Sequence, residues 1–239
     1  MVAFFAGELA PEYARPVNDR AFHVCLNVVD VTDAAALDDC VARVVAESGP
    51  VDRLVHAAGI CLPGPLVEQP AAEIERVMTV NYTGTVLAVK SVVDGMVERS
   101  RGDIVLLASM AGWVPSYRLG AYDASKFAVV AFGEVLAHEL EGRGVRTVVV
   151  CPPPVDTPML DAIRAADPRA IGDQPSIRAA EVLDAAETAL ERGEIFAFPG
   201  RGTRAAVRVR RHAPDVLWRR LARIERGPAS QPRHGAPPA

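Results

Sequence analysis

Residues 103–126 read DIVLLASMAGWVPSYRLGAYDASK, and this stretch decides the fold class. Its opening run, Asp103–Ser109, is nearly all apolar, which is typical of a strand buried on both faces. A helix is predicted over Leu119–Gly142, and a further apolar strand over Val145–Cys151. A strand, a helix of this length and a second strand form a βαβ unit, which predicts a parallel sheet.

The same alternation continues on both sides of this unit. Further strands are predicted over Ala21–Val29, Val51–Ala57 and Glu194–Phe198, and helices from Thr32 or Asp33 to Glu47, over Pro70–Arg99 and over Ala179–Arg192. We therefore expect an α/β fold with a doubly wound, Rossmann-like parallel sheet. Ligands bind such sheets at the carboxyl ends of the strands. The expected site segments are Ala57–Gln69, Ser109–Leu119 and Cys151–Ile177, the last of which could form a mobile lid.

Composition excludes several classes of protein. The chain has 239 residues, 50% of them hydrophobic and 23% charged, which excludes wholesale disorder. No apolar run approaches the roughly 20 residues of a membrane span, and no secretory signal is recognisable. We expect a cytoplasmic protein with buried, reduced cysteines, because its four cysteines form no CxxC pair. The five histidines lack metal-ligand spacing, so no metal site is predicted.

Tyr122 and Lys126 are the strongest candidates for chemistry. Their spacing of four residues places both side chains on one face of the predicted helix. A nearby ammonium favours the phenolate form of a tyrosine, which would let Tyr122 exchange protons closer to neutral pH. Ser109, at the end of the preceding strand, could hydrogen-bond the same substrate oxygen. The alternative is an ordinary pair of residues on an exposed helix surface.

Because of these residues and several further motifs, the sequence resembles the short-chain dehydrogenase/reductase family over roughly residues 20–200. The matching pieces occur in the family's order: Asp30-Val31, His56-Ala57-Ala58-Gly59, Asn81-Tyr82-Thr83-Gly84, then Ser109, Tyr122 and Lys126, and finally Cys151-Pro152-Pro153-Pro154-Val155-Asp156-Thr157. The resemblance implies NAD(P)-dependent interconversion of a secondary alcohol and a ketone, with NAD or NADP as cofactor. It also implies a homo-oligomer, with dimer surfaces on Pro70–Arg99 and Leu119–Gly142.

The resemblance also assigns roles to individual residues. Tyr122 would be the general acid/base, Lys126 would bind the nicotinamide ribose, Ser109 would orient the substrate, and Asn81 would anchor a proton-relay water. The implied cofactor-binding residues are Asp30, Val31, Ala57, Ala58, Gly59, Tyr122, Lys126, Pro152, Val155 and Thr157.

Structural roles are the alternatives for several of these residues. Asn81 could cap or kink a helix, Asp30 could cap a strand end, and Thr157 could cap the helix at Met159. Trp113 and Tyr117 could line a substrate pocket or merely cover the loop that contains them.

The main departure from the family is an absence. No Thr-Gly-xxx-Gly-x-Gly turn, which would hold the pyrophosphate, precedes Gly59. We therefore expect an N-terminally truncated domain lacking roughly its first forty residues. Either the start is assigned too late, or the chain is truncated and its cofactor binding is impaired. Alternatively, Val2–Ala6 could fill the gap in the sheet. A competing hypothesis is a cofactor-deficient relative that acts as a non-catalytic binding or interaction module.

Smaller departures affect the cofactor contacts. His56 and Ala57 replace two amides, and Pro153 replaces the loop glycine. The preference between NAD and NADP is not readable, because the strand that normally carries it is not found. The substrate is not readable either.

The C-terminal end carries the opposite charge to the rest of the chain. We predict a main domain over residues 1–200 and a basic helical tail over 201–239, disordered after about 227. The tail has ten arginines and two acidic residues, although the whole chain has a net charge of −4. An apolar stripe flanked by arginines (Val216, Leu217, Leu221 and Ile224) suits contact with an anionic membrane surface, with the chain's own acidic body or with another subunit. No nucleic-acid motif accompanies it.

Overall fold

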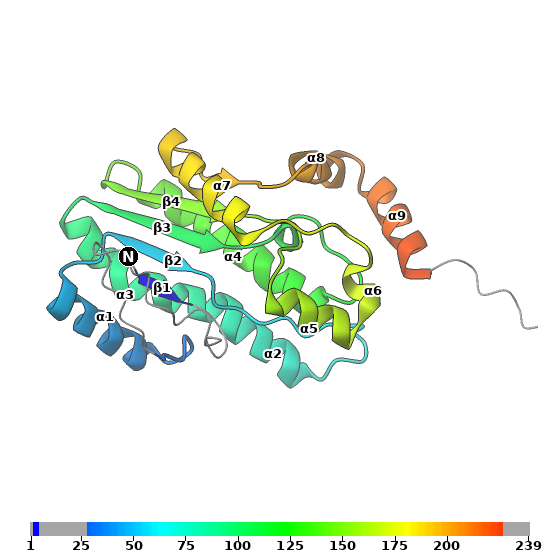
Figure 1. The fold of residues 1–239 in the computed structure, drawn as a ribbon, viewed down its shortest axis with the longest axis horizontal. Coiled ribbons are helices and arrows are strands. Elements are labelled where there is room, and N and C mark those ends of the chain that lie inside the picture. Colours follow the sequence, from blue (N-terminus) through cyan, green and yellow to red (C-terminus); the bar gives the residue numbers. More distant parts are fainter. Residues whose placement is uncertain (1, 5–27, 227–239) are drawn as a thin grey trace, which may run out of the picture.

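The computed structural model describes residues 2–4 and 28–226, which form a parallel sheet with helices on both faces (Figure 1). The strand order within these residues is β1-β2-β3-β4-β5. The strands are β1 (Val2–Phe4), β2 (Arg53–His56), β3 (Gly102–Leu107), β4 (Val145–Val150) and β5 (Phe196–Ala197). All four pairings are parallel. The predicted α/β class is therefore confirmed.

The helices follow the predicted alternation with strands. They are α1 (Ala34–Ser48), α2 (Ala71–Met78), α3 (Gly84–Glu98), α4 (Gly120–Glu139), α5 (Pro158–Ala166), α6 (Pro168–Ile171), α7 (Ala179–Arg192), α8 (Thr203–His212) and α9 (Pro214–Arg226). The Asp33 side chain accepts a hydrogen bond from the Ala36 amide and so caps α1, as the sequence predicted.

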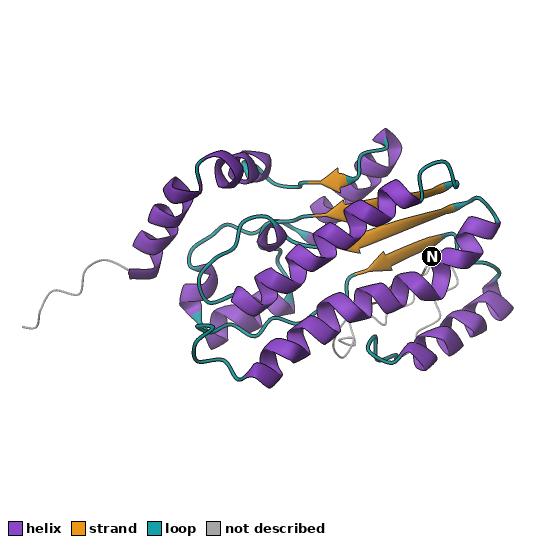
Figure 2. Cartoon of the chain, turned by 180° about the vertical axis from the view of Figure 1, so that it is seen from behind, coloured by secondary structure: helices purple, strands orange, loops and turns teal. Residues whose placement is uncertain are grey.

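Alternating side chains of the strands face two separate apolar clusters. Leu54, Ile104, Leu106 and Val149 belong to the larger cluster, which includes residues of α1, α3 and α4. Val105, Val148 and Val150 pack instead with residues of α7 on the opposite face. Figure 2, seen from behind, shows the long helices α3 and α4 lying across the first face. Helices on both faces explain why these strands are continuously apolar.

The helical region predicted over Pro70–Arg99 has one irregularity. Between α2 and α3 the residues Thr79–Thr83 form a π-helical segment, η1. A π-helical turn widens the helix by one residue and often lies at a functional site. Asn81, a predicted site residue, lies in the middle of this segment and is fully buried.

The N-terminal part of the sheet differs from the main sequence prediction. β1 pairs in parallel with β2, with Val2 opposite Leu54, so the alternative in which the first residues fill this edge matches the described strand. Of the strand predicted over Ala21–Val29, residues 21–27 lie outside the described residues, and Val28 and Val29 do not belong to a strand. The predicted disorder after 227 also lies outside them.

Charged side chains join the amino ends of the three central strands, at the edge opposite the expected site. Asp103 of β3 accepts hydrogen bonds from Arg53 of β2 (2.8 Å) and Arg146 of β4 (2.7 Å). Arg53 also pairs with Glu187 of α7. Because the Asp103 side chain is only 11% exposed, this cluster fixes the strand register at one end.

The tail helices contact the rest of the molecule. Arg204 of α8 pairs with Glu194 (3.0 Å), and Glu225 of α9 pairs with Arg118 (2.8 Å). The Trp218 ring of α9 packs edge-on against Tyr117, with a centroid distance of 5.6 Å. Within the described ranges, no helix combines the length and apolarity needed to cross a membrane.

Candidate active site

The predicted catalytic residues meet beyond the carboxyl ends of β2 and β3. Ser109 follows β3 and caps the short 3₁₀ helix η2 (Met110–Gly112), its Oγ accepting a hydrogen bond from the Ala111 amide at 3.1 Å. Tyr122 and Lys126 lie in the first two turns of α4. The Ser109 hydroxyl lies near enough to the Tyr122 phenol to lower its pKa. The structure thus brings together the serine and the phenol, as the sequence predicted.

Lys126 is buried beside the Tyr122 ring. Its Nζ lies 5.6 Å from the ring centroid and donates a hydrogen bond to the Leu107 carbonyl oxygen at 2.8 Å. Burial lowers the pKa of Lys126 to about 8. The ammonium is therefore anchored at the end of β3, between the strand and the phenol.

The pKa of Tyr122 differs from the sequence-based expectation. Burial raises it above the ordinary value, Cys61 and Asp123 raise it further, and only the hydrogen bond with Ser109 lowers it. The direction of this shift is opposite to the expected one, because burial is its largest cause. The role of Tyr122 in proton transfer stays a prediction.

Asn81 is held on every side by hydrogen bonds. Its Nδ2 donates to the Ile60 carbonyl oxygen and to Ser125 Oγ, both at 2.9 Å, while its Oδ1 accepts from the Ile60 amide at 2.7 Å. Ser125 Oγ donates in turn to the Tyr122 carbonyl oxygen at 2.7 Å. Asn81 thereby joins the loop after β2 to the helix that carries Tyr122. Its side chain fixes the site geometry, while a contact with a relay water stays a prediction.

Gly59 lies directly against this network. A Cβ atom at this position would stand 3.2 Å from Asn81 Oδ1 and 3.7 Å from Lys126 Nζ. Ala58 and Gly59 are buried just after β2, and His56 at its end is buried too. Burial and the nearby Lys126 lower the pKa of His56 to about 3, so this imidazole is neutral.

The loop after β4 lies beside the same edge of the sheet. The Pro152 carbonyl oxygen accepts a hydrogen bond from the Met110 amide at 2.9 Å, and Val155 forms a parallel bridge with Ile177. Thr157 caps α5, since its Oγ1 accepts a hydrogen bond from the Leu160 amide. The capping alternative for Thr157 is therefore observed, and a cofactor contact stays a prediction.

Asp30 and Val31 lie on the far side of the expected cofactor site. Asp30 is exposed, and its Oδ1 accepts hydrogen bonds from the Thr32 amide (2.9 Å) and hydroxyl (2.8 Å). These bonds lower the pKa of the carboxyl. Val31 is buried and packs against Gly84, where a Cβ would approach its Cγ2 to 2.8 Å. Asp30 therefore closes the turn before α1 and does not cap a strand end, because residues 28–30 do not form a strand.

Several residues near Tyr122 were missed by the sequence reasoning. Cys61 and Asp123 both raise the pKa of Tyr122, and Ser125 holds Asn81. Burial raises the pKa of Cys61 to about 12, so it is a neutral thiol. The only sequence signal for Ser125 was its position next to Lys126. Nothing in the sequence places Cys61 near the phenol.

Trp113 and Tyr117 have separate roles. Trp113 packs edge-on against Phe196 at 5.2 Å and donates its Nε1 hydrogen to Cys151 Sγ at 3.3 Å. It therefore covers the core, whereas Tyr117 contacts Trp218 of α9. The Tyr122 ring instead packs in a small apolar cluster with residues of the predicted lid. This cluster contains Cys61, Leu119, Met159, Ile163, Ala170 and Ile171.

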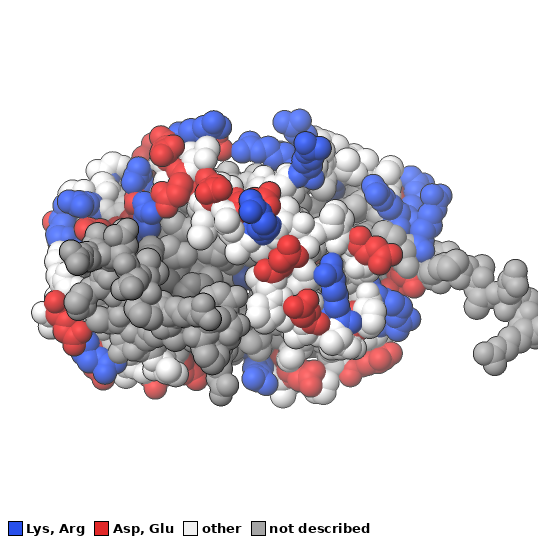
Figure 3. All heavy atoms as spheres, in the orientation of Figure 1, with Lys and Arg blue, Asp and Glu red and all other residues white. Residues whose placement is uncertain are grey.

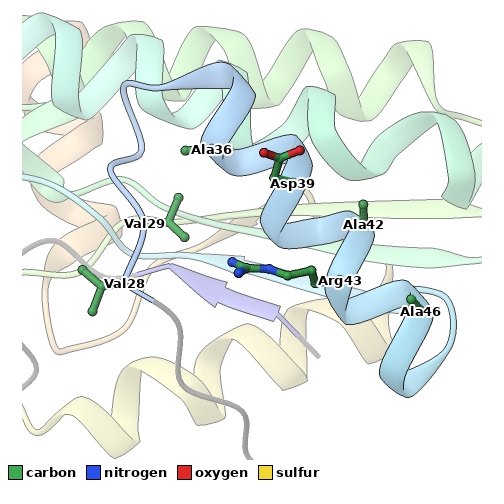
Figure 4. A pocket seen from close by; sticks show the side chains of 7 residues that line it. All are labelled: Val28, Val29, Ala36, Asp39, Ala42, Arg43 and Ala46. Carbon is green, nitrogen blue, oxygen red and sulfur yellow. The ribbon is translucent and has the colours of Figure 1, made fainter.

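A surface hollow of about 570 Å³ lies along α1 (Figure 4). It is lined by Val28, Val29, Ala36, Asp39, Ala42, Arg43 and Ala46, none of which is a predicted site residue. Val28 directly follows residues that the structure does not describe, so this hollow carries no functional assignment. Within residues 28–226, no group of three His, Cys, Asp or Glu residues could hold a metal ion.

Known proteins share both the sequence pattern and the fold. A family model described as short chain dehydrogenase matches residues 6–168. A 1-deoxy-11-beta-hydroxypentalenate dehydrogenase of Streptomyces exfoliatus is 31% identical over 219 residues, covering 90% of this chain and 78% of the relative. A 3-ketodihydrosphingosine reductase of Bos taurus is 33% identical over 142 residues, or 59% of this chain; the match spans only 43% of that longer protein.

Solved structures agree on the fold. A short chain dehydrogenase from Burkholderia cenocepacia, solved in complex with NADP, superimposes with a TM-score of 0.69 at 24% identity. The superposition covers 82% of this chain and 77% of that one. Together with the match over residues 6–168, these similarities show that the chain belongs to the short-chain dehydrogenase family of oxidoreductases.

Proposed function

We propose that this protein is an NAD(P)-dependent oxidoreductase that interconverts a secondary alcohol and a ketone, with Tyr122 as general acid/base. One observation carries the proposal: the Ser109 hydroxyl lowers the pKa of the neighbouring Tyr122 phenol, and the buried Lys126 ammonium lies 5.6 Å from the centroid of its ring. A serine, a phenol and an ammonium at the end of a parallel strand can bind a carbonyl oxygen and exchange a proton with it.

The residues around Lys126 fit the nicotinamide ribose end of the cofactor. Lys126 is a buried cation within a turn of the phenol, and Gly59 leaves room that a Cβ would fill. Some structural relatives were solved with NADP, which supports the same cofactor class here. When bound, NAD(P)H supplies the hydride. Lys126 would hold the ribose, with Gly59, Val155 and Thr157 beside the nicotinamide and Asp30 and Val31 near the adenine.

The protein's own residues would then manage the substrate oxygen. Ser109 Oγ donates a hydrogen bond to the carbonyl oxygen, and Tyr122 Oη transfers its proton to the same oxygen during reduction. The resulting phenolate is stabilised by the Lys126 ammonium. Because burial raises the pKa of Tyr122, the phenol would carry its proton at neutral pH and could donate it during reduction.

The surroundings of Tyr122 support an apolar substrate. Met159, Ile163 and Ile171 from α5 and α6 pack around the phenol with Leu119. Such walls exclude water and favour a hydrophobic ketone or alcohol over a sugar. The names of two relatives, a hydroxypentalenate dehydrogenase and a ketodihydrosphingosine reductase, also describe apolar molecules that carry a hydroxyl or keto group.

A cofactor titration followed by a substrate screen tests this function. We expect the purified chain to change NADH or NADPH fluorescence and to reduce hydrophobic ketones, such as alicyclic or long-chain ones. Absence of any change with both cofactors would refute the proposal for this chain.

The non-catalytic alternative rests on one sequence observation: residues 1–58 contain no glycine-rich turn for a pyrophosphate. If cofactor does not bind while the Ser109–Tyr122–Lys126 geometry is intact, a binding or interaction role is favoured. Calorimetric titration with each cofactor separates the two hypotheses without needing a substrate.

We also propose that the tail contacts an anionic membrane surface. Exposed arginines lie along α8 and α9, beside the exposed side chains of Val209 and Val216. These arginines are Arg204, Arg208, Arg211, Arg219, Arg220 and Arg223. In Figure 3, basic side chains gather along the upper right of the molecule, over these helices. Each arginine near an anionic lipid surface contributes about 1 kcal/mol.

Vesicle sedimentation tests this contact. We expect binding to vesicles containing phosphatidylglycerol, none to pure phosphatidylcholine, and loss of binding when Arg219 and Arg223 are both replaced by glutamate. Equal binding by this variant would contradict the proposal.

Self-association remains a proposal too. Phe127 and Val135 of α4 are exposed apolar side chains, 39% and 55% accessible, on one of the two helices expected to form dimer surfaces. Sedimentation velocity of the wild type and of Val135→Lys measures this directly, and a wild-type monomer would contradict it.

A further inference from the structure

Arg118 lies at the meeting point of four segments. It precedes α4 by two residues and Tyr122 by four, so it belongs to the loop that leads into the helix carrying Tyr122. Its φ of 67° is in the left-handed region, which glycine adopts readily and arginine rarely does. Its carbonyl oxygen accepts a hydrogen bond from the Gly64 amide at 2.7 Å, which ties it to the loop after β2.

The guanidinium of Arg118 binds two carboxylates from different elements. Nη1 donates to Asp167 Oδ2 at 2.7 Å, while Nε and Nη2 donate to Glu225 Oε1 at 2.9 and 2.8 Å. The three side chains are only 10%, 14% and 24% exposed. Both carboxylates raise the pKa of the guanidinium. Charge-assisted, bidentate contacts with little exposure are the strong class of hydrogen bond.

Each carboxylate belongs to a segment with a place near the site. Asp167 is at once the residue that ends α5 and the cap that begins α6. Side chains of these two short helices, among them Ile163 and Ile171, pack with Tyr122. Glu225 lies near the end of α9, whose Trp218 packs on Tyr117, directly next to Arg118. The Arg118 side chain thus links the tail and the α5–α6 segment to the loop that precedes Tyr122.

We infer that Arg118 is a positioning residue that makes α9 part of the cover over the apolar cluster around Tyr122, where the proposed substrate pocket would lie. Releasing α9 would leave the Arg118 side chain held by Asp167 alone and would loosen α5–α6, whose apolar side chains pack with Tyr122. The left-handed backbone of Arg118 fits this role, because a non-glycine residue there is justified by what its side chain binds. The inference rests on the proposed function only for its effect on substrate; the mechanical coupling is independent of turnover.

Amide hydrogen exchange of the full chain, read by mass spectrometry, tests the coupling. In Glu225→Gln we expect exchange to accelerate on the order of tenfold in peptides from both α9 and α5–α6, because the charge-assisted bonds to α9 are lost and the Arg118 side chain that binds Asp167 loses its second anchor. Peptides from β4 should be unchanged. Arg118→Lys should show the same pattern, since a lysine cannot bind two carboxylates in a fork.

Asp215→Asn is the matched control. It removes one negative charge from the same helix, at its first turn rather than near Arg118, and should leave exchange in α5–α6 unchanged. Acceleration confined to α9 in Glu225→Gln, or no acceleration at all, would overturn the inference. So would a uniform increase that includes β4, because it would indicate general destabilisation instead of a local coupling.

Kinetics give a second readout once a substrate is found. Glu225→Gln should raise the KM for the ketone severalfold and leave the KM for the cofactor and kcat nearly unchanged, because the pocket wall contacts substrate. An unchanged substrate KM would contradict the role of α9 as a cover. A chain without any turnover would refute the proposed function, while the exchange experiment would still decide the coupling.

Discussion

Two aspartates mark two ends of the expected cofactor site, and they differ in almost every physical respect. Asp123, next to Tyr122, is 3% exposed, and burial raises its pKa to about 7. Asp30, at the end expected to meet the adenine, is exposed, and hydrogen bonds from Thr32 lower its pKa. The first lies among groups fixed by buried hydrogen bonds, whereas the second merely closes a turn.

This difference shows that side chains are held more rigidly around Tyr122 than around Asp30. Around Tyr122, the side chains of Asn81, Ser125 and Lys126 are buried and each has a hydrogen-bonding partner. Proton transfer needs groups held within hydrogen-bonding distance, while a contact with an adenine ring tolerates looser placement. Substitutions at the two ends should therefore differ sharply in effect.

Replacing Tyr122 by phenylalanine should have the largest effect on activity. The variant keeps the apolar ring but loses the proton donor, so we expect turnover to fall by at least about 10²–10⁴-fold. The melting temperature should change little, because the ring contacts remain. Initial rates and a thermal melt measure both quantities. Retained turnover would overturn the assignment of Tyr122 as general acid/base.

Replacing Asn81 by alanine should have the largest effect on stability. The change removes three hydrogen bonds and leaves the half-buried Ile60 amide and carbonyl without their Asn81 partner. We expect the free energy of unfolding to fall by about 2–4 kcal/mol in urea titrations. Ser125→Ala, which removes a smaller part of the same network, should cost about 1 kcal/mol. If Asn81→Ala destabilised the protein no more than Ser125→Ala does, the role of Asn81 as the link between the loop and α4 would be contradicted.

The buried carboxyl of Asp123 should make stability depend on pH. Its pKa of about 7 lies above the ordinary value of 3.8, so the folded protein binds more protons than the unfolded chain between these values. Stability should therefore decrease as pH rises from 4 to 7, by up to about 4 kcal/mol from this group.

Asp123→Asn should flatten this dependence. The asparagine carbonyl can still accept the hydrogen bond that the Ser116 amide donates to Asp123 at 2.8 Å. Urea titrations at pH 4, 5.5 and 7 compare the slopes of wild type and variant. Identical slopes would show that Asp123 is solvated in solution and would weaken the contrast with Asp30.

Replacing Asp30 by alanine should have the smallest effect. Two exposed hydrogen bonds to Thr32 are lost, so stability should fall by less than about 1 kcal/mol. If Asp30 also contacts the adenine, the Kd for the cofactor should rise severalfold while kcat stays unchanged. An unchanged Kd would leave Asp30 with the turn-closing role alone. Thr32→Val, which removes only one of the hydrogen bonds, is the matched control.

Local pattern accounts for much of what could be predicted. The helix over Ala179–Arg192 and the cap at Asp33 agree with the structure because both depend on neighbouring residues. The strand over Val145–Cys151 is one residue shorter in the structure. The triad of Ser109, Tyr122 and Lys126 was also predictable, since a strand end and a spacing of four residues bring these side chains to one edge.

Contacts between distant residues could not be predicted. Arg118 meets Asp167 across 49 positions and Glu225 across 107, and no periodicity of the sequence relates them. The partner of Asn81, Ser125, is likewise 44 positions away. The pairing of β1 with β2 was open only as an alternative, because three residues carry too little pattern to assign an edge.

The amino-acid sequence by itself determined the order of helices and strands, the parallel sheet and the spacing that places Tyr122 and Lys126 side by side. These depend on periodicity and spacing, which are local properties of the chain. Only the tertiary structure decided that Tyr122 is removed from water, that Asn81 joins the loop after β2 to α4, and that Arg118 pairs with both Asp167 and Glu225. Those outcomes depend on how much water folding removes from each group and on which distant charges it brings within hydrogen-bonding distance.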